Sequence, residues 1–101
     1  MFQIPLSNPD ITELEKQAVM DVLDTPNLSL GPKVVEFENN FANYIGAKYA
    51  VAVNSGTSGL HLCVRAIGTT PCDIFLTTPF SFIASANCAL YEGAIPKFVD
   101  I

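Results

Sequence analysis

The sequence has 101 residues, 50% of them apolar and 15% charged, and its formal net charge is −5. This length suits a single domain, and the apolar content excludes an intrinsically disordered chain. Five basic residues against ten acidic ones leave no basic stripe for a nucleic-acid backbone. No apolar stretch reaches the roughly 18–20 residues of a membrane span. We therefore expect a folded protein that binds neither nucleic acid nor membrane.

The first part of the chain, residues 1–48, is expected to form an extended arm and two helices. Prolines in the PLSNP stretch disfavour a helix before Asp10. Apolar residues at helical spacing predict the first helix over residues 11–23, with Asp10 as its N-cap. The second helix is expected to begin at Pro32, which suits the first helical position, and to end at Gly46 as a C-cap.

From residue 49 onward, strands and helices alternate in the order β-α-β-α-β. The expected strands cover residues 49–54, 74–78 and 97–101, and the helices between them cover 58–67 and 81–91. Short apolar strands separated by helices of about ten residues indicate an α/β fold with a parallel sheet. Because the last strand would leave a bare sheet edge, residues 49–101 are interpreted as the first, incomplete part of a larger domain.

The segment Asn54–Gly59 (NSGTSG) follows the first expected strand and opens a helix. A helix N-terminus offers free N–H groups and a partial positive charge, which suit an anion such as phosphate. Gly56 lets the backbone approach such a ligand, and the hydroxyls of Thr57 and Ser58 add donors. The segment is neither a P-loop nor a GxGxxG fingerprint, so an ordinary Ser/Thr N-cap stays open as an alternative.

A second loop, residues 77–82 (TTPFSF), again lies between a strand and a helix. An aromatic ring at this place can stack on a flat heterocycle. The alternative is that Phe80 and Phe82 are core residues.

The histidine and the cysteines form no recognisable catalytic or metal-binding pattern. His61 is interpreted as a packing or capping residue. Cys63, Cys72 and Cys88 are expected to be small buried hydrophobes. Three cysteines without a CxxC pair argue against a disulfide framework and a zinc site, and they favour a reducing compartment.

Taken in order, the stretches IPLSNPDI, LSLGPKVVEF, NSGTSGLHL and LTTPFSFIASANCALYEGAIPKFVDI resemble the N-terminal part of the sugar aminotransferases of the DegT/DnrJ/EryC1/StrS family. These are pyridoxal-phosphate (PLP) enzymes of the aspartate aminotransferase fold, fold type I. The resemblance covers nearly the whole chain but only about a quarter to a third of a family member. It implies a large-domain parallel or mixed sheet, in a three-layer α/β/α fold in the complete protein.

The resemblance also implies roles for matching positions. It assigns the PLP phosphate to Gly56, Thr57 and Ser58, and the stacking of an aromatic ring on the pyridine to Phe82. It places the turn before the second helix near the substrate, which involves Leu28, Ser29 and Gly31. The cofactor-binding lysine and the acid that pairs with the pyridine nitrogen match no residue up to 101. No catalytic residue is therefore assigned, and the chain alone is expected to be inactive.

The reaction implied by the resemblance moves an amino group, usually from glutamate, to a keto-sugar carried on a nucleotide. A cytoplasmic homodimer is expected for the complete protein. A PLP-dependent sugar dehydratase of the same family and a non-catalytic remnant remain as alternatives. A nucleotide-binding α/β domain is disfavoured, because no ribose-binding acid lies about twenty residues after the glycine turn.

Overall fold

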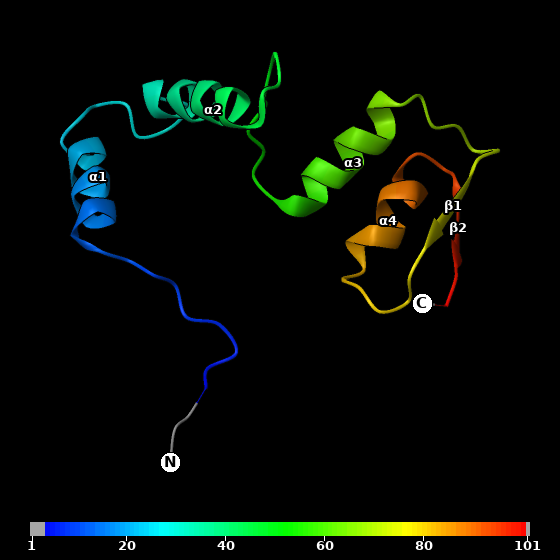
Figure 1. Ribbon diagram of the computed structural model, residues 1–101. Coiled ribbons are helices and arrows are strands. Elements are labelled where there is room, and N and C mark those ends of the chain that lie inside the picture. Colours follow the sequence, from blue (N-terminus) through cyan, green and yellow to red (C-terminus); the bar gives the residue numbers. More distant parts are fainter. Residues whose placement is uncertain (1–3, 101) are drawn as a thin grey trace. The chain divides into compact units, whose positions relative to one another are not determined.

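The computed structural model describes residues 4–100 and contains four helices and two strands there (Figure 1). The chain divides into two compact units, one up to Ala52 and one from Val53 onward. The elements in chain order are α1 (Glu13–Leu23), α2 (Pro32–Ile45), α3 (Gly56–Ala66), β1 (Ile74–Thr77), α4 (Ala84–Tyr91) and β2 (Ile95–Phe98). None of the described helices is long and apolar enough to cross a membrane.

Helix α1 begins with a capping box centred on Thr12. The Thr12 hydroxyl accepts a hydrogen bond from the Leu14 N–H at 3.2 Å, and the Glu15 carboxylate accepts one from the Thr12 N–H at 2.6 Å. The expectation that Asp10 is the N-cap is therefore wrong. The Thr-x-x-Glu pattern that satisfies two helix-end donors starts two residues later.

Helix α2 confirms both of its expected ends. Pro32 occupies its first position, where the missing N–H costs no helical hydrogen bond. Gly46 is its C-cap, with a left-handed φ of 69°, and its N–H bonds back to the last turn.

The second unit is built on a β-α-β arrangement that confirms the α/β fold class. Strands β1 and β2 pair in parallel, with Ile74 opposite Ile95 and Thr77 opposite Phe98. Helix α4 connects them and packs against both strands and against α3. The buried side chains at the centre of this unit are all small: Val64, Ala84, Ala86, Cys88, Ala89 and Ala94.

The expected strand over residues 49–54 is not formed in the described part of the chain. A strand exists only where a ladder partner does, and the sheet of residues 4–100 contains β1 and β2 alone. The Ala52 N–H instead donates to the Glu38 carboxylate at 2.8 Å. The last strand also differs, because it starts at Ile95, and Pro96 is tolerated on an edge strand where no ladder donor is needed. Residue 101 lies outside the described residues.

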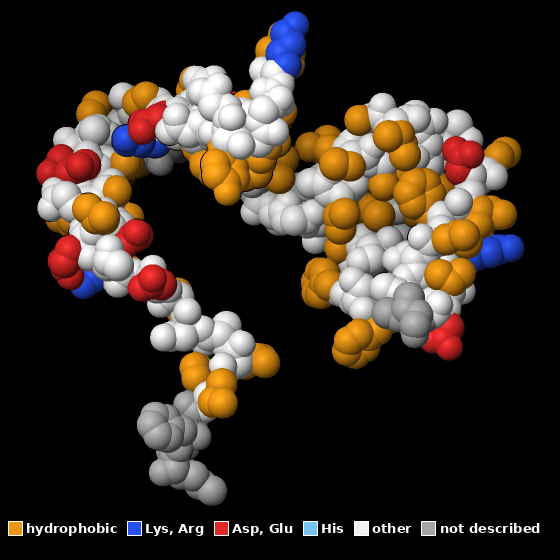
Figure 2. All heavy atoms as spheres, viewed as in Figure 1, with side chains coloured by type: hydrophobic (Ala, Val, Ile, Leu, Met, Phe, Trp, Pro, Cys, Tyr) orange, Lys and Arg blue, Asp and Glu red, His pale blue; other side chains and the backbone are white. Residues whose placement is uncertain are grey.

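Large apolar side chains remain exposed across both units (Figure 2). No bulky side chain among the described residues is fully buried. The apolar fraction noted in the sequence is therefore carried largely by surface rather than by core.

Candidate functional site

The first turn of α3 presents two backbone donors that have no partner among residues 4–100. Ser55 is the N-cap, and its hydroxyl accepts from the Ser58 N–H at 3.1 Å. The Ser55 carbonyl accepts from the Gly59 N–H at 3.0 Å. The N–H groups of Gly56 and Thr57 are left over, as helix geometry requires of the first turn. Both lie at the positive end of the α3 dipole.

The Ser58 hydroxyl is already engaged within the turn. It donates to Oδ1 of Asn54 at 2.7 Å and accepts from the Ser55 hydroxyl at 3.0 Å. The structure thus brings Ser58 together with Gly56 and Thr57. The hydroxyl proton of Ser58, however, is already donated to Asn54. Sequence reasoning gave Asn54 no role of its own, although an amide four residues before a serine is a recognisable local partner.

The donor set fits a phosphate group. A Cβ atom added to Gly56 would meet no atom within 4 Å, so the space beside the two free N–H groups is open. No acidic side chain occurs in the NSGTSG segment to repel an anion. The Thr57 hydroxyl adds a third donor, with no hydrogen-bond partner in the described part of the chain. These residues could hold the phosphate of PLP.

The loop between β1 and α4 carries two exposed phenylalanines. Phe80 is 90% exposed and Phe82 is 74% exposed, so the alternative that they are core residues is wrong. Helices α3 and α4 run in the same general direction, so this loop and the first turn of α3 lie toward the same end of their unit (Figure 1).

The turn before α2, in the first unit, is conformationally restricted. Leu30 has a left-handed φ of 50°, which a branched side chain rarely adopts. A Cβ on Gly31 would lie 2.5 Å from the Asn27 carbonyl oxygen, so only glycine fits there. Ser29 is exposed on this turn.

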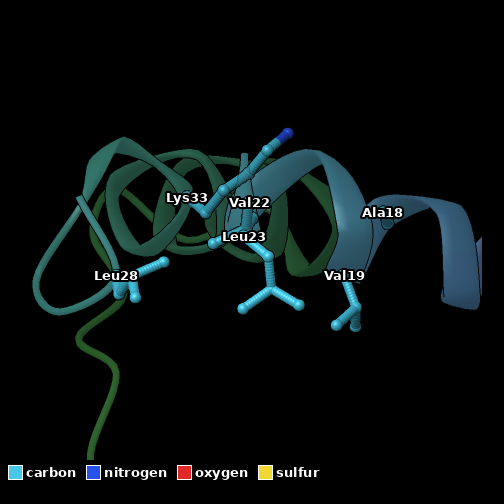
Figure 3. A pocket seen from close by; sticks show the side chains of 6 residues that line it. All are labelled: Ala18, Val19, Val22, Leu23, Leu28 and Lys33. Carbon is cyan, nitrogen blue, oxygen red and sulfur yellow. The ribbon is translucent and has the colours of Figure 1, made fainter. Parts of the chain in front are cut away.

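An apolar pocket of about 410 Å³ lies between α1 and the start of α2 (Figure 3). Its size falls within the range of small-molecule sites. Of the three expected substrate residues only Leu28 lines it; the lining residues are Ala18, Val19, Val22, Leu23, Leu28 and Lys33. The Lys33 ammonium lies 2.7 Å from the Glu36 carboxylate, whose hydrogen bond and charge raise the pKa of Lys33.

The cysteines and the histidine behave differently from one another. Cys88 is buried, but Cys63 and Cys72 are exposed, so the expectation of burial is wrong for those two. Their positions fall outside the small-residue core that α4 builds. His61 is a packing residue as expected, with its ring 5.0 Å from that of Tyr91. Within residues 4–100 no group of three potential ligands could hold a metal ion.

A parallel β-α-β unit defines an α/β protein, and the start of α3 offers free N–H donors. Comparison with known proteins gives the family. The DegT/DnrJ/EryC1/StrS aminotransferase family matches residues 9–101, and the chain belongs to it.

Three similar proteins illustrate what the chain resembles within this family. It is 46% identical over 98 residues to the spore coat polysaccharide biosynthesis protein SpsC of Bacillus subtilis, covering 97% of this chain and 25% of SpsC. Spr1654 of Streptococcus pneumoniae, assigned as a sugar aminotransferase and solved in a PLP form, matches with a TM-score of 0.88 and 35% identity, covering 99% and 26% of the two chains.

The third is the Escherichia coli GDP-4-keto-6-deoxy-D-mannose-3-dehydratase with bound hydrated PLP. It matches with a TM-score of 0.86 and 31% identity, covering 100% of this chain and 28% of the dehydratase. The chain therefore spans about a quarter of the length of the relatives it matches. The solved relatives identify the fold as that of PLP-dependent sugar enzymes.

Proposed function

We propose that this chain supplies the phosphate-binding turn and the ring-stacking aromatic of a PLP-dependent aminotransferase. The reaction moves an amino group from glutamate to a keto-sugar linked to a nucleotide. The observation that carries the proposal is the pair of free N–H groups of Gly56 and Thr57 beside open space, in a member of an aminotransferase family. The nucleotide-linked substrate is supported by the similar dehydratase, whose name specifies a GDP-linked keto-sugar.

Each residue of the proposed site has a separate task. The N–H groups of Gly56 and Thr57 and the Thr57 hydroxyl bind the phosphate, and Ser58 shapes the turn around them. The Phe82 ring covers one face of the pyridine and excludes water from it. Leu28, Ser29 and Gly31 contact the substrate. When bound, PLP supplies the electron sink that amino-group transfer requires.

The phosphate assignment is tested with PLP and with pyridoxal, which lacks the phosphate. The protein carrying this chain should bind PLP much more tightly than pyridoxal. Thr57→Val removes one hydroxyl without changing shape and should weaken PLP binding about tenfold, while pyridoxal binding stays constant. Thr70→Val makes the same change beyond the other end of α3 and serves as the control. Equal affinity of the unaltered protein for the two ligands contradicts the proposal.

The stacking assignment is tested within one loop. Phe82→Leu should weaken the binding of both PLP and pyridoxal by about threefold to tenfold, the value of one aromatic contact. Phe80→Leu, two residues away and more exposed, should leave both affinities unchanged. If the Phe80 variant shows the loss instead, the stacking ring is assigned to the wrong residue.

The second candidate function is PLP-dependent dehydration of a nucleotide-linked sugar, favoured by the match to the 3-dehydratase. The two reactions are separated with ¹⁵N-glutamate and a nucleotide-linked 4-keto-6-deoxy sugar. An aminotransferase places the ¹⁵N on the sugar, whereas a dehydratase gives a product that has lost water and carries no label. Mass spectrometry of the sugar product decides between them.

We further propose that the complete protein is a cytoplasmic homodimer. All three cysteines are free, which supports a reducing compartment. Light scattering on the purified protein should give twice the chain mass, and a monomer contradicts the proposal.

A further inference from the structure

A polar and aromatic cluster joins α3 to the end of α4. The Glu92 carboxylate and His61 Nε2 form a hydrogen bond of 2.7 Å. The Arg65 guanidinium lies 3.5 Å from the same oxygen. The His61 and Tyr91 rings also pack in a T-shaped arrangement, with their centroids 5.0 Å apart. This is the cross-helix polar contact between α3 and α4.

Glu92 lies where a carboxylate is unfavourable by itself. It is the C-cap of α4, at the negative end of that helix dipole. Its side chain is only 15% exposed, so solvent screens it weakly. His61 and Arg65 of α3 offset both the unfavourable helix dipole and the loss of solvent around the carboxylate. The carboxylate of Glu92 is therefore stabilised by His61 and Arg65 of α3. The same two contacts hold α3 against the end of α4.

The contact lies close to the proposed phosphate turn. His61 follows Thr57 by four residues, which is about one helical turn, so the two lie on the same side of α3. Among the described residues the first turn makes no polar side-chain contact with α4: the Ser55 and Ser58 hydroxyls bond to each other and to Asn54. Glu92 is thus a charged group of α4 that holds two side chains of α3.

We propose that Glu92 is a positioning residue for the cofactor phosphate: through His61 and Arg65 it fixes α3, and so the direction in which Gly56 and Thr57 aim their N–H groups. This inference rests on the proposed function, because it assumes that those N–H groups bind the phosphate of PLP. Glu92 acts only through α3 and touches no reacting atom.

The test compares two ligands and one exchange measurement in the protein carrying this chain. Glu92→Ala should lower the affinity for PLP about tenfold and leave the affinity for pyridoxal unchanged. Without ligand, hydrogen–deuterium exchange at the Ser58 and Gly59 amides should speed up by a similar factor, because these bonds close the first turn. Glu36→Gln, a paired carboxylate in the other unit, is the control and should change nothing.

Two further variants keep the proposal falsifiable if Glu92→Ala folds poorly. Glu92→Gln keeps an oxygen acceptor for His61 but loses the charge that faces Arg65, so it should show a smaller loss than Glu92→Ala. His61→Ala should reproduce the Glu92→Ala effect, and the double variant should lose no more than either single one.

A lower melting temperature with an unchanged ratio of PLP to pyridoxal affinity overturns the positioning role and leaves the proposed function standing. If the unaltered protein binds PLP no better than pyridoxal, the proposed function fails, and the positioning role fails with it.

Discussion

The Ser58 hydroxyl donates a 2.7 Å hydrogen bond to Oδ1 of Asn54, four residues earlier in the chain. A serine hydroxyl carries one proton, so Ser58 cannot donate to a phosphate while it donates to Asn54. The amide of Asn54 therefore competes with any anion for this donor. The turn carries fewer free donors than its sequence suggests.

Asn54→Ala should release the Ser58 proton and increase the affinity for PLP by about twofold to tenfold, the worth of one hydrogen bond. Asn54→Asp keeps the acceptor and adds a negative charge, so it should weaken PLP binding instead. Ser58→Ala should change PLP affinity little. A tenfold loss in Ser58→Ala would show that the hydroxyl turns to the phosphate and that the Asn54 bond does not hold it.

Gly56→Ala separates ligand binding from stability. The added methyl group meets no atom of the described chain, and alanine favours a helix over glycine, so the melting temperature should stay constant or rise. The methyl group does occupy the open space beside the free N–H pair, so PLP affinity should fall. Gly59→Ala, whose Cβ makes an ordinary contact with Val53, is the matched control and should keep full affinity. Calorimetry measures both the melting temperature and the PLP affinity of each variant.

Leu30→Asn should stabilise the protein. Leu30 holds a φ of 50° and is 91% exposed, so the substitution relieves a strained backbone and loses little buried surface. Asparagine tolerates this conformation, and the expected gain is about 0.5–1 kcal/mol in the free energy of unfolding. Leu6→Asn removes another exposed leucine, one without a left-handed φ, and should change stability little. A lower free energy of unfolding for Leu30→Asn would contradict the view that the backbone at Leu30 is strained.

The stability of the first turn of α1 should depend on pH. Hydrogen bonds from the Thr12 hydroxyl and the Thr12 N–H lower the pKa of Glu15 below its ordinary value of 4.5. A depressed pKa stabilises the folded state above pH 4.5, and this contribution is lost as the pH falls through the lowered pKa. The protection of the Leu14 amide against hydrogen exchange, measured relative to an unstructured peptide at the same pH, should therefore fall below about pH 4.5. Glu15→Gln should remove this dependence, whereas Glu13→Gln, which loses only the pair with Lys16, should keep it.

Elements with local signals were predictable from the sequence. Pro32 and Gly46 fix α2 because one restricts the first position and the other reaches a left-handed φ that ends the helix. The Ser55–Ser58 turn is encoded in the same way, since a serine N-cap bonds to an amide three residues later. The geometry of the first turn of α3 therefore follows from neighbouring residues.

Features that join distant residues were not predictable. The segment 49–54 has the composition of a buried strand, but strand formation depends on a partner that no local pattern supplies. The contact between His61 and Glu92 spans 31 residues, and nothing near either residue indicates the other. The exposure of Phe82 likewise depends on what packs around its ring, which no local pattern indicates.

The residues that helix α4 buries are three alanines and a cysteine, and Ala89 is completely buried. Truncation at these positions has almost nothing left to remove, whereas any enlargement must push the helix outward from β1, β2 and α3. At these positions, substitutions by smaller residues are therefore tolerated better than substitutions by larger ones. The close packing of α4 against β1, β2 and α3 therefore depends on these positions staying small.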